Sequence, residues 1–159
     1  MGNARLKKLE FQEINQRWSE FKELSKKALN DEKNQTNLGD YFEIAMARFF
    51  LLCQSGNAQV WISSEEENEC YLCFSFIGNS ALSQEKGLTI YSVVKFNKAF
   101  VVDKEDHWTN ALREVFKFAK SNHCKNIYIE TDLDYLVDMF KKSALPFNYL
   151  VRNSLSVQI

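Results

Sequence analysis

Glycine and proline are scarce in this sequence. Of 159 residues five are glycine and one, Pro146, is proline, and the last glycine is Gly87. The segment from Leu88 to Ile159 therefore has no glycine-rich loop of the kind that lets backbone N–H groups approach a phosphate. The motifs GxSxG, HExxH and GxxxxGK are also absent. Serine-hydrolase, zinc-protease and P-loop chemistry thus lack their starting residues.

An excess of charge and long apolar runs are missing too. Twenty basic and 21 acidic residues leave a net charge of -1, which predicts no binding to nucleic acid or to an anionic membrane. The longest apolar stretch, FFLLC, is far shorter than the roughly 18 residues of a membrane span. No signal peptide is recognisable, and Leu6 stands where a myristoylation signal after Gly2 needs Ser or Thr. We expect one cytoplasmic domain over residues 1–159.

Four cysteines include a CxxC pair, Cys70 and Cys73, beside Cys53 and Cys124. A zinc site would need two more soft ligands, and the two histidines of the chain lie far away in sequence. Residues three apart on a strand point to opposite faces. We therefore expect buried free thiols and no metal site.

The first third of the chain is expected to be helical. Apolar residues recur at spacings of three to five over residues 11–29, after a short possible strand at 5–11. Residues 30–40 have no periodicity and predict a loop, in which Asp40 caps the next helix. Residues 41–55 are apolar nearly all round, which predicts a central helix, and Gly56 is placed to end it.

Strands dominate the chain after Gly56. Residues 58–63 and 70–77 predict a hairpin around an acidic turn, and residues 87–96, apolar on both faces, predict an interior strand. A helix is expected to begin at Asp106 or Thr109, because apolar residues that include Ala111, Leu112 and Val115 recur at helical spacing. A strand at 125–131, a helix at 131–145 and strands at 147–151 and 154–159 should follow. The order β-α-α-β-β-β-α-β-α-β-β indicates an α/β (α+β) fold with a mixed sheet.

This order, with the runs ALREVFKFAKSNHCKNIYIETD and DMFKKSALPFNYL, resembles the GNAT superfamily of N-acetyltransferases. The motif-level resemblance covers about Leu88 to Leu150. It implies a mainly antiparallel sheet with helices on both faces. It also implies acetyl-CoA as donor of an acetyl group to an amine.

The sequence departs from the family at the acetyl-CoA turn. The resemblance places a Q/R-x-x-G-x-G/A turn between the fourth strand and the next helix, and this chain has FVVDKEDHWTNA there. Its carboxylates repel phosphate, whereas acidic residues are favourable at a helix N-terminus. No cofactor is expected. The positions of the family loop are Asp103, Lys104, Glu105, Asp106, His107, Trp108 and Thr109.

A second departure concerns catalysis. Acetyl transfer benefits from a base for the amine and an acid for the leaving thiolate. The resemblance implies a Tyr in the last helix, where this chain has Phe140, so Tyr135 and the carboxylates Glu69 and Glu130 are the remaining candidates. His107 beside Asp106 is expected to be a solvated cap. His123 is expected to replace glycine at a helix C-terminus.

These departures predict a GNAT-fold pseudoenzyme that has lost acetyl-CoA binding and acts as a protein-binding or structural component. Degenerate domains of this family occur in bacteriophage and accessory genes, which adds a virion as a possible location. The alternative is an active N-acyltransferase that uses acetyl-CoA through a divergent donor site. A protein partner or a homodimer is expected to use aromatic side chains in excess of the core, namely Phe42, Phe49, Phe50 and Trp61.

Overall fold

The computed structural model describes residues 5–33, 39–79, 85–96, 105–130, 148–151 and 154–158. Its helices are α1 (Phe11–Lys33), α2 (Gly39–Ser55) and α3 (Glu105–Ser121). Its strands are β1 (Arg5–Lys8), β2 (Ala58–Glu65), β3 (Asn68–Asn79), β4 (Lys86–Lys95), β5 (Asn126–Glu130), β6 (Asn148–Val151) and β7 (Ser154–Gln158). The helix expected at 131–145 lies outside the described residues.

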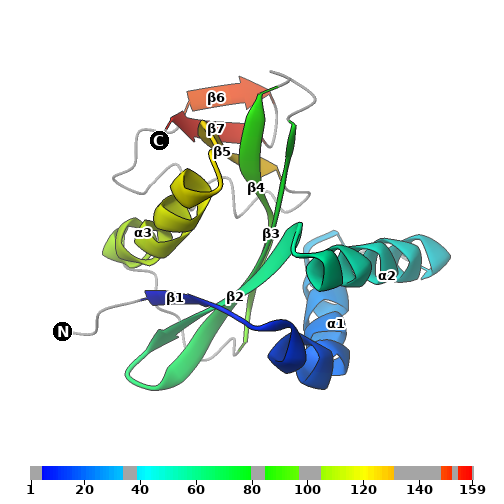
Figure 1. Cartoon of the computed structure of the whole chain (residues 1–159). Helices are drawn as coiled ribbons and strands as arrows, with labels where there is room; N and C mark the ends of the chain where they lie inside the picture. The colour runs from blue at the N-terminus through cyan, green and yellow to red at the C-terminus, as the bar shows by residue number, and fades with distance from the viewer. Residues whose placement is uncertain are drawn as a thin grey trace.

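The strands form one sheet in the order β1-β2-β3-β4-β5-β7-β6. The β4–β5 pair is parallel, and the other neighbouring pairs are antiparallel. Helix α3 covers one face of the sheet, and α1 and α2 cover the other (Figure 1). The expected mixed, mainly antiparallel sheet with helices on both faces is confirmed, and so is the interior position of β4.

Two hydrophobic clusters result from this layering, because alternate side chains of a strand point to opposite faces. On β3, Tyr71 and Cys73 pack toward α3, whereas Leu72 and Phe74 pack toward α1 and α2. The α3 contribution to the first cluster comes from fully buried residues at helical spacing, namely Ala111, Leu112, Val115 and Ala119. The apolar stripe expected in this helix is therefore its core face.

A β-bulge corrects the expectation for the CxxC pair. The register of β2 on β3 passes from Ser63↔Tyr71 to Ser64↔Glu69, so Cys70 is the extra residue. A bulge interrupts the alternation of faces, and Cys70 joins Cys73 in the cluster under α3. The prediction that these two side chains lie on opposite faces is wrong for this reason.

The thiols themselves are as expected. All four cysteines are free and buried. Burial raises the pKa of Cys53 to about 12, and it also raises the pKa of Cys73. Such thiols are almost entirely protonated at neutral pH, which makes them poor nucleophiles and poor metal ligands. The described part of the chain holds no group of His, Cys, Asp or Glu residues arranged for a metal ion.

The C-terminal ends of α2 and α3 follow their sequence signals, whereas α2 already begins at Gly39, so the prediction that Asp40 caps it from outside is wrong. Gly56 has a φ of 85°, and its N–H bonds to the carbonyl of Cys53 at 3.2 Å, as in a Schellman cap. His123 takes the same position after α3, with a φ of 62°, which confirms its expected replacement of glycine. Helix α1 runs on to Lys33, so the first residues of the predicted loop are helical.

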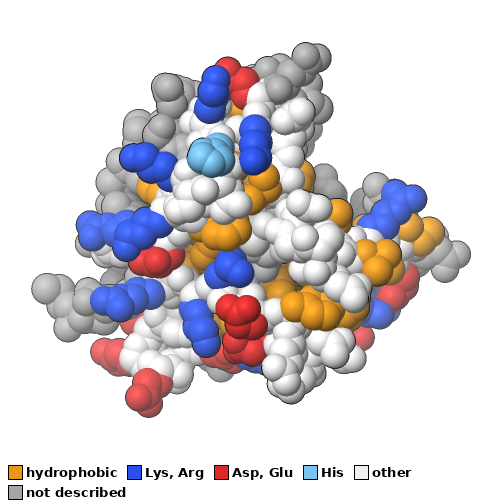
Figure 2. Space-filling view, viewed as in Figure 1, with side chains coloured by type: hydrophobic (Ala, Val, Ile, Leu, Met, Phe, Trp, Pro, Cys, Tyr) orange, Lys and Arg blue, Asp and Glu red, His pale blue; other side chains and the backbone are white. Residues whose placement is uncertain are grey.

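Helix α2 is not buried on all sides, contrary to the expectation of a central helix. Ile44, Leu51 and Leu52 are 52%, 62% and 41% exposed, and Figure 2 shows hydrophobic side chains on the surface over this helix. The aromatic residues assigned to a surface surplus are instead inside: Phe42, Phe49 and Trp61 are buried and Phe50 packs against the core. The sequence identified an apolar helix but not the side that faces the sheet. Within the described residues, no helix has the length and hydropathy needed to cross a membrane.

Candidate functional site

The β4–α3–β5 unit defines the first candidate site. Strands β4 and β5 pair in parallel from Gly87↔Asn126 to Ile90↔Ile129, and β4 then continues to Lys95. The register of β4 on β3 shifts at the same point, from Ile90 to Ser92. Ligands of α/β sheets commonly bind beyond the carboxyl ends of parallel strands. By this rule, the end of the β4–β5 ladder is the position expected for a ligand.

Helix α3 is the element that follows β4 in the chain, and its N-terminus carries the positive end of the helix dipole. The structure places Glu105, Asp106, His107, Trp108 and Thr109 in the first turns of this helix, one residue before the earlier of the two expected starts. Asp103 and Lys104 lie outside the described residues. Acidic residues are favoured by the dipole at a helix N-terminus, and their charge opposes binding of a phosphate.

The candidate Glu69 lies elsewhere, on the face covered by α1. Both of its carboxylate oxygens accept hydrogen bonds from Arg17 of α1, at 2.7 and 2.8 Å. Glu69 precedes the point where β3 pairs with the end of β4, at Tyr71↔Lys95. Its carboxylate thus joins a helix to the sheet and is already engaged by a cation.

Glu130 is the last residue of β5 and pairs with Ser154 of β7. Strand β4 lies between the two glutamates and serves to measure their separation: Glu130 follows the residue that pairs with Ile90, and Glu69 precedes the one that pairs with Lys95. At about 3.3 Å per residue, Glu69 and Glu130 are separated by roughly 20 Å along the strand direction. The structure therefore does not bring these two carboxylates together. Tyr135 lies outside the described residues.

Arg17 organises a cluster that sequence reasoning missed. Besides Glu69, its guanidinium donates to both carboxylate oxygens of Glu20, at 2.8 and 2.9 Å, and stacks 5.1 Å from the Phe21 ring and 5.6 Å from the Phe96 ring. These hydrogen bonds raise the pKa of Arg17 and lower the pKa of Glu20. The i, i+3 spacing of Arg17 and Glu20 was visible in the sequence, but the contact with Glu69, 52 residues away, was not.

Replacing Arg17 with methionine is expected to lower the free energy of unfolding by about 1–2 kcal/mol at pH 7, because a two-sided ion pair with partial burial is lost. The pKa of Glu20 is lowered from its ordinary 4.5, so this stabilisation is present above about pH 4.5 and disappears as the pH falls through the lowered pKa. Urea unfolding of both proteins at pH 7 and pH 3 measures the difference.

The matched control is Lys117→Met, which removes one exposed i, i+3 pair with Glu114 and should cost less than about 0.5 kcal/mol. An Arg17→Met deficit that stays the same at pH 3 would contradict an electrostatic origin.

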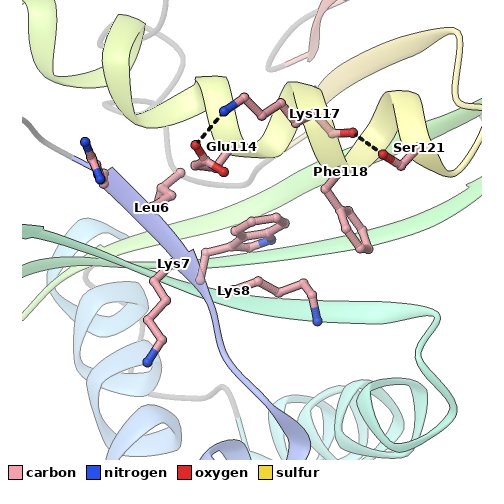
Figure 3. Close-up of a pocket in the computed structure, with 9 residues that line it drawn as sticks. Leu6, Lys7, Lys8, Glu114, Lys117, Phe118 and Ser121 are labelled. Atoms are coloured by element: carbon pink, nitrogen blue, oxygen red, sulfur yellow. Dashed lines mark hydrogen bonds and ion pairs between the residues drawn. The ribbon is translucent and has the colours of Figure 1, made fainter.

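A groove between β1 and α3 forms a second candidate site, with a volume of about 520 Å³. Figure 3 shows β1 running beneath α3, with Phe118 directed from the helix into the space between them. The lining residues are Arg5, Leu6, Lys7, Lys8, Trp61, Glu114, Lys117, Phe118 and Ser121. A volume of this size lies within the usual range of ligand sites.

The floor of the groove is apolar and rigid. Leu6 and Trp61 are both 2% exposed, and the Trp61 ring meets the Phe118 ring edge to face at 5.5 Å. The Trp61 indole N–H donates to the Ser75 hydroxyl at 2.8 Å, and that hydroxyl donates to Gln59. The indole is therefore fixed in place by a buried network.

The rim of the groove is basic. Arg5, Lys7, Lys8 and Lys117 line it against one carboxylate, Glu114, which is paired with Lys117 at 3.1 Å. The Lys8 ammonium lies 5.6 Å from the centre of the Phe118 ring, whereas Lys7 points toward α1, where it meets Glu13 (Figure 3). A local excess of positive charge therefore borders an apolar floor in a chain whose net charge is -1.

No protein-family model and no curated protein sequence matches this chain. Solved structures match it over almost its whole length. A predicted acetyltransferase from Clostridium acetobutylicum, solved with acetyl-CoA, is similar with a TM-score of 0.65 and 13% identity over 93% of this chain and 94% of the other. A GNAT-family acetyltransferase from Streptococcus agalactiae gives a TM-score of 0.61 and 11% identity over 98% and 94%.

The PaiA N-acetyltransferase of Thermoplasma acidophilum, solved with coenzyme A, gives a TM-score of 0.60 and 9% identity over 98% of this chain and 99% of the other. Likeness at such low identity concerns the fold alone. The chain has the fold of the GNAT acetyltransferases, as the sequence resemblance implied.

Proposed function

We propose that this chain is a GNAT-fold binding protein that has lost acetyl-CoA binding and acts through a protein partner, as an accessory or phage-type component. The main observation that supports this proposal is the start of α3, whose first two residues are Glu105 and Asp106. The chain also has no glycine from Leu88 onward. Acidic residues at a helix N-terminus oppose the binding of a pyrophosphate, which such termini otherwise bind through their backbone amides. The second support is the basic, apolar-floored groove beside α3, which offers a binding surface separate from the β4–β5 end.

A direct test is titration of the purified chain with acetyl-CoA, followed by calorimetry and by thermal unfolding. We expect no heat of binding and no change of melting temperature at about 1 mM ligand. A dissociation constant of about 10 μM would instead stabilise the chain by about 2.7 kcal/mol at this concentration and raise the melting temperature by roughly 5–10 °C. That outcome would refute the loss of acetyl-CoA binding.

The alternative is an active N-acyltransferase that takes an acetyl group from acetyl-CoA. The observation that favours it is the fold likeness to structures solved with acetyl-CoA or coenzyme A. Binding in the titration, followed by release of free coenzyme A when an amine is added, would establish this activity. Against it stands the engagement of Glu69 by Arg17, which leaves that candidate base tied to a cation.

Homodimerisation remains a proposal. A candidate surface for the dimer contact is the exposed apolar side of α2, which is formed by Ile44, Leu51 and Leu52. Sedimentation of the intact chain at two concentrations would test it.

A further inference from the structure

The residues that line the groove between β1 and α3 extend along both elements. Its lower wall is the whole of β1, four residues or about 13 Å of extended chain. Its upper wall runs along α3 from Glu114 to Ser121, about 10 Å of helix. A groove of this length matches three or four residues of an extended peptide better than it matches a compact small molecule.

The backbone of β1 adds hydrogen-bonding groups to this groove. β1 is an end strand of the sheet, and in the described residues it pairs with β2 alone. The Leu9 N–H bonds to the Val60 carbonyl at 2.9 Å, and hydrogen-bonded pairs alternate along an antiparallel ladder. The amides and carbonyls of Leu6 and Lys8 therefore point away from β2, at the edge where another strand can add.

The positive charges on the rim of the groove favour an acidic ligand. The ammonium groups of Lys8 and Lys117 and the guanidinium of Arg5 lie on its rim. Lys117 is paired with the one lining carboxylate, Glu114, so these four residues together carry an excess of two positive charges. Between these charges, the partly buried Phe118 offers an apolar face against Trp61. Aromatic anchors surrounded by complementary charge are typical of peptide-binding surfaces.

We propose that the β1–α3 groove binds an acidic, extended peptide segment of a partner protein. The segment adds as a strand to the outer edge of β1, sets its carboxylates against Lys8 and Lys117, and places one aromatic or aliphatic side chain over Phe118. This inference rests on the proposed protein-binding role and names the chemistry of the partner. It involves no residue of the α3 N-terminus, so it is tested separately from acetyl-CoA binding.

The test uses the full chain and a fluorescein-labelled peptide of sequence Asp-Glu-Phe-Glu-Leu-Asp-Glu, followed by anisotropy up to about 1 mM protein. We expect saturable binding that weakens at least fivefold between about 50 and 300 mM salt, because exposed charges are screened. The peptide with Gln and Asn in place of its acids, and the peptide with alternate N-methylated amides, should each bind at least tenfold more weakly.

Variants locate the binding on the chain. Lys8→Glu combined with Lys117→Glu should weaken binding at least tenfold, whereas Lys26→Glu combined with Lys27→Glu, two exposed lysines of α1, should change it less than twofold. Lys8→Gln with Lys117→Gln repeats the test without introducing acids. Melting curves of all variants confirm that they are folded.

Three outcomes would overturn the inference. They are no binding of the acidic peptide at about 1 mM, equal effects of the groove pair and the α1 pair, and tighter binding of a seven-nucleotide oligothymidylate than of the peptide. Undiminished binding of the N-methylated peptide would refute addition to the edge of β1. Each outcome is independent of the acetyl-CoA titration, so failure of one proposal is distinguishable from failure of the other.

Discussion

Replacing Phe74 with alanine is expected to lower the free energy of unfolding by about 3–5 kcal/mol, the usual cost of removing a buried phenylalanine ring. Phe74 is 1% exposed and lies on the central part of β3. Its ring is 5.0 Å from the ring of Phe49 on α2 and 6.3 Å from that of Trp18 on α1. One side chain therefore joins both helices of this face to the sheet, and its loss leaves a cavity between three elements.

Thermal unfolding measures the effect as a fall in melting temperature of about 6–20 °C. Ile44→Ala is the matched control, because it removes an apolar side chain from α2 that is 52% exposed; it should change stability by less than about 0.5 kcal/mol. Equal losses for the two variants would mean that this cluster does not carry the stability of the α1 and α2 layer.

The second large effect is expected at Gly87, where β4 begins its parallel pairing with β5. A Cβ atom here would overlap the ring of Tyr128 and lie 2.9 Å from the carbonyl oxygen of Asn126. Tyr128 is buried and the carbonyl belongs to the neighbouring strand, so neither can withdraw freely. Gly87→Ala should therefore cost about 3 kcal/mol through overpacking.

Gly78 provides a control on the facing strand, since it pairs with Gly87 across β3 and β4. A Cβ at Gly78 would find its nearest atom, on Phe76, 4.0 Å away, and Gly78→Ala should be neutral within about 0.5 kcal/mol. Denaturant unfolding of the two variants compares them directly. A Gly87→Ala protein as stable as Gly78→Ala would show that β4 and β5 can separate at this point without cost.

The fold was largely predictable because its elements have strong local signals. Apolar residues on both faces of β4 predicted an interior strand, and the helical spacing of Ala111, Leu112 and Val115 predicted the buried face of α3. His123 was expected at the end of that helix, and it is there with a positive φ. Local periodicity suffices for such elements because each buries a face defined by neighbouring residues.

The site was less predictable because its parts are distant in sequence. The groove joins Lys8 of β1 to Phe118 of α3, and nothing in either segment identifies the other. The bulge at Cys70 likewise reversed the expected facing of the CxxC pair. The candidates Glu69 and Glu130 were chosen by residue type, and the structure separates them.

The sequence by itself determined the order of the described elements, the burial of β4 and α3, and the absence of a glycine-rich phosphate loop after Gly87. These depend on residue type and short-range spacing. Only the tertiary structure decided which side of α2 packs against the sheet and that Arg17 pairs with Glu69. It also decided that basic side chains of β1 and α3 line one groove with an apolar floor. Those features depend on how separate elements pack together, and the energy of packing comes from contacts between residues that no local pattern relates.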